Sequence, residues 1–299
     1  MRDFLELTKP RITVLILICT AVGYYFGCAG FINSSIFARL LLGTALLASG
    51  TLALNQWYEA DSDALMHRTR ERPIPAGRMT RAHGFAFGAL LSISGFAELW
   101  YGTNALAATL GLFTLLTYLL VYTPLKRRSG ICITIGALPG AMPPLIGYAA
   151  AHGGLDTSAF SLFLIMFVWQ FPHVYAIAWM FREGYARGGI RILPVIEPDG
   201  KTTARRIAVC SAVLIPISLV PRFVGMTGSL YMIIAIAAGL ALAYFGVRLG
   251  QKRSSSRARH VLLASILYLP LLFVAMIADR SMPTNPAPAS LVIDVATHD

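Results

Sequence analysis

The feature that most constrains this chain is a series of nine apolar runs, each close to the roughly 20 residues that a helix needs to cross a bilayer. With 56% hydrophobic residues, 13% charged residues and a mean hydropathy of +0.65, 299 residues cannot hide their apolar side chains in one soluble core. Backbone polar groups in lipid must bond within their own segment, so the runs predict helices. The expected spans are 12–29, 36–56, 84–101, 105–122, 131–151, 159–181, 207–226, 228–247 and 261–278.

We therefore expect an all-α, polytopic membrane protein with nine transmembrane helices around a central cavity. Residues 1–280 are expected to form a single intramembrane domain, and residues 281–299, which are rich in Pro and Ala, a flexible external tail. Spans one and five resemble each other, and so do the charged loops after spans two and six. This pattern predicts a four-helix unit repeated in one orientation, with a ninth helix added.

The net charge of +11 reflects membrane topology rather than nucleic-acid binding. All but three of the 25 Lys and Arg residues lie in the N-terminal arm or in the even-numbered connections. The three exceptions are Arg39, Arg222 and Arg280. By the positive-inside rule, the N-terminus and the even-numbered loops are cytoplasmic, and the C-terminus after nine spans lies outside the cell. We expect the cell (inner) membrane as the location and the lipid bilayer as a partner, with no nucleic acid.

A dense polar cluster from Asn55 to Pro73 ends the second span, and it indicates chemistry at that point. On a helix, Asn55, Glu59 and Asp63 recur at intervals of four, so their oxygens share one face, whereas Asp61 points away. An amide and two carboxylates suit a hard divalent cation such as Mg²⁺, whose remaining positions are filled by water or substrate phosphates. The arginines just beyond this face would bind those phosphates.

Four ordered motifs closely resemble the protoheme IX farnesyltransferases, the heme O synthases. These enzymes are intramembrane prenyltransferases related to the 4-hydroxybenzoate polyprenyltransferases. The resemblance covers about residues 8–278, and the last of the motifs is particular to the heme branch. The motifs are the run from Asn55 to Pro73, Tyr122-Thr123-Pro124-Leu125-Lys126-Arg127, Gly136-Ala137-Leu138-Pro139-Gly140-Ala141 with Pro143-Pro144, and Trp169-Gln170-Phe171-Pro172-His173.

The resemblance implies transfer of a farnesyl group from farnesyl diphosphate to a vinyl group of protoheme IX (heme B), with water supplying the hydroxyl group of the product, heme O. The acid face described above would hold Mg²⁺ and the diphosphate, whose growing negative charge must be neutralised during ionisation. A downstream heme-modifying enzyme would receive the product. The residues expected to bind the diphosphate are Arg68, Arg72, Lys126 and Arg127.

His173 and Glu183 are two further candidates. A histidine at the depth of His173, behind Pro172, is a functional candidate by default, and the resemblance makes it a heme-binding residue; a hydrogen-bonded packing role is the alternative. The related enzymes carry an acid directly before the Tyr of the loop after span six, but here that residue is Gly184. Either Glu183, which stands one residue early, takes that place as the second metal ligand, or a second Mg²⁺ is held by Glu197, Asp199 or solvent.

Two other functions fit part of the pattern. An aromatic polyprenyltransferase acting on a quinone precursor would share the fold and the first motif, but the Trp-Gln-x-Pro-His segment argues against it. A membrane transporter would share the composition, yet it should carry ionisable groups at the bilayer midplane. This chain has few such groups, chiefly Glu98 near a helix end and His173.

Overall fold

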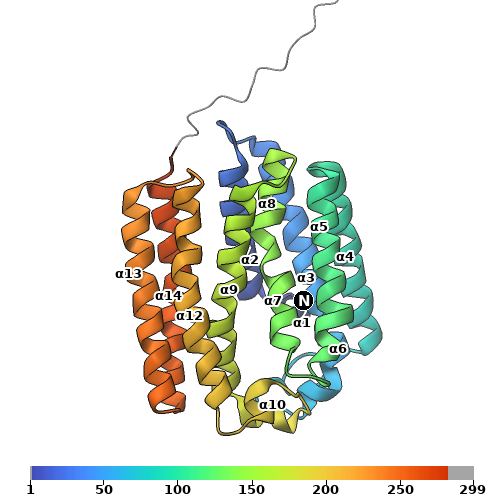
Figure 1. The fold of residues 1–299 in the computed structure, drawn as a ribbon. Coiled ribbons are helices and arrows are strands. Elements are labelled where there is room, and N and C mark those ends of the chain that lie inside the picture. Colours follow the sequence, from blue (N-terminus) through green and yellow to red (C-terminus); the bar gives the residue numbers. More distant parts are fainter. Residues whose placement is uncertain (1, 282–299) are drawn as a thin grey trace, which may run out of the picture.

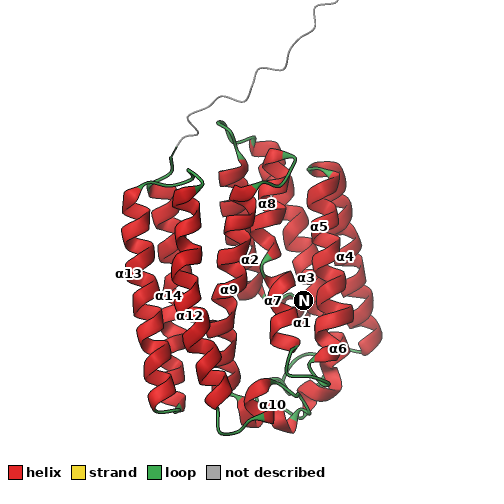
Figure 2. Cartoon of the chain, viewed as in Figure 1, coloured by secondary structure: helices red, strands yellow, loops and turns green. Residues whose placement is uncertain are grey.

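The computed structural model describes residues 2–281, and the regular structure in this range is helical apart from one backbone bridge between Thr227 and Arg280 (Figures 1 and 2). The expected external tail therefore lies outside the described residues from position 282 onward. The segments are α1 (Arg2–Leu7), α2 (Pro10–Gly27), α3 (Ser34–Ala64), α4 (Arg81–Gly102), α5 (Ala105–Leu116), the π-helix η1 (Thr117–Tyr122), α6 (Thr123–Leu125), α7 (Cys132–Gly140), α8 (Met142–His152), α9 (Thr157–Met180), α10 (Arg182–Arg187), α11 (Leu193–Ile196), α12 (Lys201–Phe223), α13 (Ser229–Gln251) and α14 (Ser255–Ala278).

The described part of the chain contains nine helical segments long and apolar enough to cross a membrane, which confirms the expected number. The bounds differ where helices continue beyond their apolar part: α3 runs to Ala64 rather than to residue 56, and α12 and α14 each begin six residues early. The fifth span is divided between α7 and α8 at Ala141. Pro143 has no N–H group to continue the helical hydrogen bonding there.

The helices form three groups in the view of Figure 1. α12, α13 and α14 lie on one side, α3, α4 and α5 on the other, and α2, α7, α8 and α9 between them. α2 packs on α8 in the middle, α3 packs on α4, and α9 packs on α12. Helix α10 and the loop after α3 lie at the same end of the bundle (Figure 1), which is the arrangement that the predicted repeat requires.

Close helix contacts in the bundle depend on small residues, as expected where lipid offers no hydrophobic drive for association. A Cβ atom on Gly147 of α8 would lie 1.9 Å from the carbonyl oxygen of Thr20 in α2. A Cβ atom on Gly95 of α4 would lie 2.3 Å from the backbone nitrogen of Leu47 in α3. These approaches bring α8 against α2 and α4 against α3.

Candidate active site

The predicted acid face lies on the last turns of α3. Because α3 continues to Ala64, Asn55, Glu59 and Asp63 fall on one side of an unbroken helix. Asn55 and Asp63 are each only 1% exposed. Asp61 is turned away, and its exposed carboxylate pairs with Arg81 at the start of α4. The structure thus places Asp61 outside the three-residue face, as the helical spacing predicted.

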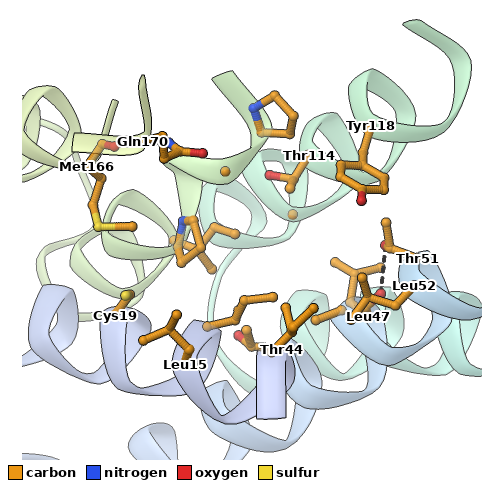
Figure 3. Close-up of a pocket in the computed structure, with 18 of the residues that line it drawn as sticks. Leu15, Cys19, Thr44, Leu47, Thr51, Leu52, Thr114, Tyr118, Met166 and Gln170 are labelled. Carbon is orange, nitrogen blue, oxygen red and sulfur yellow. Dashed lines mark hydrogen bonds between the residues drawn. The ribbon is translucent and has the colours of Figure 1, made fainter. Parts of the chain in front are cut away.

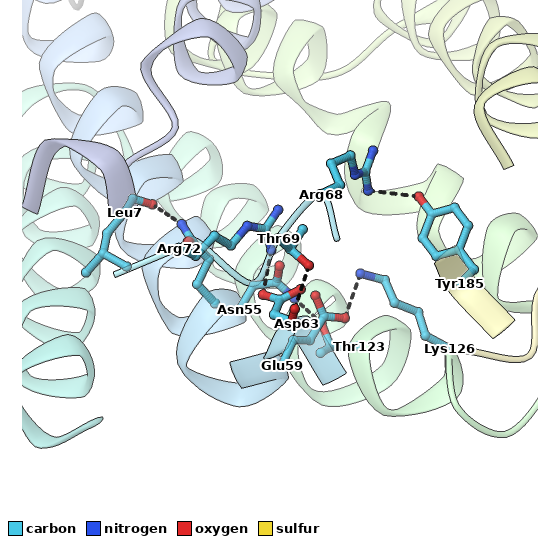
Figure 4. A network of polar contacts seen from close by, with 11 residues as sticks. Leu7, Asn55, Glu59, Asp63, Arg68, Thr69, Arg72, Thr123, Lys126 and Tyr185 are labelled. Atoms are coloured by element: carbon cyan, nitrogen blue, oxygen red, sulfur yellow. Dashed lines mark hydrogen bonds and ion pairs between the residues drawn. The ribbon is translucent and has the colours of Figure 1, made fainter. Parts of the chain in front are cut away.

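Each carboxylate of this face is paired with a cation from another segment. Nζ of Lys126 donates to Oε1 of Glu59 at 2.8 Å, and Nη1 of Arg72 donates to Oδ2 of Asp63 at 2.6 Å (Figure 4). An unpaired buried charge costs several kcal/mol, so these partners are what allow two acids to lie at the edge of an apolar bundle. The structure therefore brings two of the four expected phosphate-binding residues directly to the acid face.

The loop after α3 folds back to make one of these pairs. The hydroxyl group of Thr69 donates to the carbonyl oxygen of Asp63 at 3.0 Å, and the backbone N–H of Met66 donates to the same oxygen at 3.2 Å. Thr69 is 2% exposed, so this contact is shielded from solvent. The turn places Arg72, nine residues beyond Asp63, beside the carboxylate of Asp63.

The π-helix η1 positions the opposite side of the site. A π-helical turn is rare and is often found at functional sites. Lys126 follows η1 by four residues, and its Nζ lies 4.4 Å from the ring centroid of Tyr122. Burial opposes the charge of Lys126, but the neighbouring Tyr122 and the ion pair with Glu59 together raise its pKa well above the ordinary value. Lys126 therefore stays protonated beside the acid face.

Thr123, the first residue of α6 directly after η1, fixes the amide of Asn55. The hydroxyl group of Thr123 donates to the carbonyl oxygen of Tyr118 at 2.8 Å, which commits its only proton. Thr123 therefore accepts the 3.2 Å bond from Nδ2 of Asn55. Oδ1 of Asn55 is left as an acceptor on the acid face.

The donor set fits a hard cation that also binds its substrate. The acid face offers oxygen atoms only, from two carboxylates and one amide, and this is the chemistry that Mg²⁺ prefers. Within residues 2–281 no group of three or more His, Cys, Asp and Glu residues is gathered into a potential metal site. A cation on this face would therefore take its other ligands from water or phosphate.

Lys9 is a site residue that the sequence analysis assigned only to topology. It stands before Pro10 with a φ of 46°, a left-handed conformation that is costly for a residue with a side chain. It lines the cavity, and burial followed by the charges of Arg72 and Lys126 lowers its pKa to about 7. The Lys-Pro pair at the start of the first span is the signal that could have identified it.

Three predicted residues lie away from this cluster. Arg68 is exposed and donates to the hydroxyl group of Tyr185 at 3.3 Å, which links the two charged loops. Arg127 is exposed, and Glu183 lies on α10 with its side chain 80% exposed and 4.0 Å from Arg182. Arg68, Glu183 and Tyr185 border a separate cavity of about 290 Å³ between the loops. The assigned roles of Arg68, Arg127 and Glu183 stay predictions.

A largely apolar cavity of about 360 Å³ extends from Lys9 into the bundle (Figure 3). Its walls come from α2, α3, α4, α5, η1, α7, α8 and α9. Leu15, Leu47 and Leu52 are among the aliphatic wall residues, and Tyr118 of η1 connects the cavity to the polar cluster. The structure therefore contains the central cavity that the sequence predicted, with charged groups at one end.

His173 lines this cavity from α9. Its Nδ1 lies 2.9 Å from the hydroxyl oxygen of Ser265 in α14, and its ring stacks on Trp169 with centroids 4.8 Å apart. Helix α9 continues through Pro172, so the proline does not end the helix. His173 thus combines a packed, hydrogen-bonded environment with access to the cavity, and its heme role stays a prediction.

The model of the UbiA prenyltransferase family matches residues 16–277 of this chain. A protein named protoheme IX farnesyltransferase from Solibacter usitatus is 53% identical, over 94% of this chain and 99% of the relative. One of the same name from Koribacter versatilis is 43% identical, over 94% of each chain. The chain belongs to the UbiA prenyltransferase family. These relatives confirm the resemblance to the protoheme IX farnesyltransferases.

Solved structures of UbiA proteins share the fold. A digeranylgeranylglyceryl phosphate synthase is 18% identical, with a TM-score of 0.78 over 93% of this chain and 97% of the other. A UbiA homolog from Archaeoglobus fulgidus, solved with GPP and Mg²⁺, is 15% identical, with a TM-score of 0.65 over 92% of this chain and 99% of the other. At these identities the likeness establishes the all-helical UbiA fold of this chain.

The buried pair between Asp63 and Arg72 generates a stability prediction. Arg72→Met leaves the carboxylate of Asp63 buried without a partner, so the free energy of unfolding should fall by about 3 kcal/mol. Adding Asp63→Asn should recover most of that loss, because the orphaned charge is removed. Denaturation of the purified protein in detergent measures both effects.

Arg70→Met is the matched control for this prediction. Arg70 pairs with Glu71 at 3.3 Å, but the two side chains are 54% and 78% exposed, so the change should cost less than about 1 kcal/mol. Equal losses for Arg70→Met and Arg72→Met would contradict the assigned difference between the pairs. So would a double variant that is less stable than Arg72→Met alone.

Proposed function

We propose that this protein transfers the farnesyl group of farnesyl diphosphate to a vinyl group of protoheme IX, giving heme O. The observation that carries the proposal is the acid face of α3 with its paired cations, close to Lys9 and Tyr118 at one end of an apolar cavity in a UbiA-family chain. The curated relatives named protoheme IX farnesyltransferase support the choice of acceptor. Each structural part corresponds to one requirement of the reaction.

The first requirement is to bind and ionise an allylic diphosphate. Asn55, Glu59 and Asp63 would hold Mg²⁺, which supplies positive charge to the leaving group when it is bound. Lys126 and Arg72 are paired with the acids in this structure. A phosphate bound at the same face would be within their reach, and each cation would then bind a phosphate oxygen in place of its carboxylate. Because the cations are already positioned, little reorganisation is needed when negative charge develops on the leaving group.

The rim of the site supplies further cations. We assign diphosphate contacts to Arg68 and Arg127 as well, since both lie on the loops that surround the cluster. Glu183 is assigned to a second metal position, which requires its exposed side chain to turn inward from Arg182. Lys9 adds an amino group at the charged end of the cavity, where the diphosphate and the prenyl chain would meet.

The second requirement is an apolar, water-excluding surface around the prenyl chain and the allylic cation. The aliphatic walls of the 360 Å³ cavity suit a farnesyl tail, which is soluble in lipid. Excluding bulk water keeps the cation from being captured before it meets its acceptor. His173 is assigned to contact the heme from the deep part of this cavity, while the propionates remain near the basic rim.

The alternative functions agree less well with the molecule. A quinone-precursor polyprenyltransferase would use the same acid face, but relatives of 43% and 53% identity carry the heme enzyme's name. A transporter would need ionisable groups along a path through the bundle. Of the residues lining the main cavity only Lys9 and His173 are ionisable at moderate pH, and none of them is an acid.

We further propose that the acid face opens to the cytoplasm at the cell (inner) membrane, with the C-terminus outside. The basis is the asymmetry of the basic residues, since Arg39, Arg222 and Arg280 are the exceptions. Heme and farnesyl diphosphate would then enter from the cytoplasmic side or from the bilayer. A downstream heme-modifying enzyme in the same membrane would take up the apolar product.

The acid face predicts a sharp pattern of activity losses. Glu59→Gln and Asp63→Asn should each lower prenyl transfer by on the order of 10²-fold or more, because correctly placed charge at a developing anion is lost. Asp61→Asn is the control, since Asp61 faces away and pairs with Arg81. Diphosphate release and prenylated heme are measured at several Mg²⁺ concentrations. Equal, mild losses at all three positions would refute the metal-binding role of this face.

The orientation predicts a labelling pattern in a variant whose four native cysteines are replaced. Thr157→Cys, at the start of α9, should react with an impermeant thiol reagent added to intact spheroplasts, whereas Ser256→Cys, at the start of α14, should not. Both residues are exposed, so permeabilised membranes should label both and serve as the control. Labelling of Ser256→Cys from outside would reverse the proposed orientation.

A further inference from the structure

Two side chains of α9 introduce polar atoms into the apolar cavity. One face of this helix lines the cavity, because its lining residues are spaced three and four apart. These residues are Met166, Trp169, Gln170 and His173. Gln170 and His173 are both half-buried. The proposed function above uses His173 only as a heme contact and gives Gln170 no role. Their hydrogen bonds determine which of their atoms remain available.

The amide of Gln170 is oriented by two carbonyl groups. Its Nε2 donates to the carbonyl oxygen of Ala137 at 3.1 Å and to that of Met166 at 3.0 Å, so both amide protons are used. Oε1 receives no hydrogen bond from residues 2–281. A Cβ atom on Gly140, another cavity residue, would lie 2.0 Å from Oε1, so the missing side chain leaves room for that oxygen. Figure 3 shows Gln170 in the cavity wall beside Met166.

The imidazole of His173 is oriented by a hydroxyl group from a distant helix. Oγ of Ser265 lies 2.7 Å from the carbonyl oxygen of Leu262, an acceptor only, so Ser265 must donate its single proton there. The 2.9 Å contact between Oγ of Ser265 and Nδ1 of His173 then requires Nδ1 to be the donor. In neutral imidazole this leaves the lone pair on Nε2. No hydrogen bond reaches Nε2 from the described residues.

Trp169 strengthens this arrangement. Its ring stacks on His173, and its Nε1 donates to the backbone oxygen of Ser265 at 2.8 Å. The indole thus ties α9 to the same residue of α14 that holds Nδ1 of His173. Rotation of the imidazole about its Cβ–Cγ bond would move Nδ1 away from Ser265 and tilt the ring off Trp169.

The cavity therefore holds two acceptors, Oε1 of Gln170 and Nε2 of His173, neither of which receives a hydrogen bond from residues 2–281. Residues three apart on a helix have Cβ atoms about 5–6 Å apart, a separation that one water molecule can bridge. Unsatisfied acceptors in an apolar site are costly, so a small molecule with two protons to donate is the expected occupant. Water has that chemistry.

We propose that Gln170 and His173 bind the water molecule whose oxygen becomes the hydroxyl group of the product. The inference rests on the proposed function. When the C–O bond of the allylic diphosphate breaks, its electron pair leaves with the diphosphate. The π electrons of the vinyl group bond its terminal carbon to C1 of the farnesyl cation, which leaves a cation on the vinyl carbon next to the porphyrin. The water oxygen bonds to that carbon, and Nε2 of His173 accepts the released proton.

A single bound water molecule satisfies two opposing requirements of the reaction. The farnesyl cation must be kept from water, but the later heme cation must capture it. A water fixed by two acceptors on one wall reaches only the carbon placed beside it, while the rest of the cavity stays apolar. If that water is absent, the heme cation instead loses a proton from the adjacent carbon, and the product is an alkene lighter by one water molecule.

The ratio of hydroxylated to dehydrated product tests the proposal. The purified protein and its variants are incubated with Mg²⁺, farnesyl diphosphate and protoheme IX in ¹⁸O-labelled water, and the products are analysed by mass spectrometry. The wild type should give the hydroxylated product carrying ¹⁸O. Gln170→Met and His173→Phe should each raise the dehydrated fraction at least about tenfold, and Ser265→Ala should raise it less, since Ser265 only positions His173.

Ser211→Ala is the matched control. Ser211 is fully buried in α12, and its hydroxyl group has no hydrogen-bond partner among the described residues, so its removal should leave the product ratio unchanged. Variants that turn over slowly with the wild-type ratio would overturn the water-binding role and leave the two residues as packing or heme contacts. Absence of any prenylated heme from the wild type would instead refute the proposed function, and the inference with it.

Discussion

The structure depends on the pairing of two buried acids with two cations at the end of an apolar bundle. Glu59 and Asp63 could not remain charged at this depth without Lys126 and Arg72. To supply these cations, the loop after α3 folds back on the helix, and η1 brings the end of the fourth span toward it. The same pairing prepares a site for an anionic substrate, because both cations can transfer to phosphate oxygens.

Hydroxyl groups set the orientation of two neutral polar side chains of the site, one at the charged end and one in the apolar cavity. Thr123 has one proton and gives it to a backbone carbonyl, so it fixes the amide of Asn55; Ser265 fixes the imidazole of His173 in the same way. As a result, Oδ1 of Asn55 and Nε2 of His173 each keep a lone pair that can accept a hydrogen bond in the site. The result is a gradient along one cavity, from paired charges at the mouth, through aliphatic walls, to two neutral acceptors on α9.

Sequence periodicity was sufficient to predict the nine spans and the shared face of Asn55, Glu59 and Asp63, since both follow from helical geometry. It was not sufficient for features that depend on contacts between distant segments. The contact between His173 and Ser265 joins residues 92 positions apart, and the lowered pKa of Lys9 depends on burial and on the charges of Arg72 and Lys126, which lie in two other loops. The π-helical turn η1 has no periodic signature in six residues.

The most direct test of this account is the choice of acceptor. The purified protein is incubated with Mg²⁺ and farnesyl diphosphate, with protoheme IX and 4-hydroxybenzoate offered in parallel, and the products are identified by mass. The account predicts a farnesylated, hydroxylated heme and no prenylated benzoate, with product formation lost when the metal is chelated. Prenylation of 4-hydroxybenzoate in preference to heme, or metal-independent turnover, would contradict it.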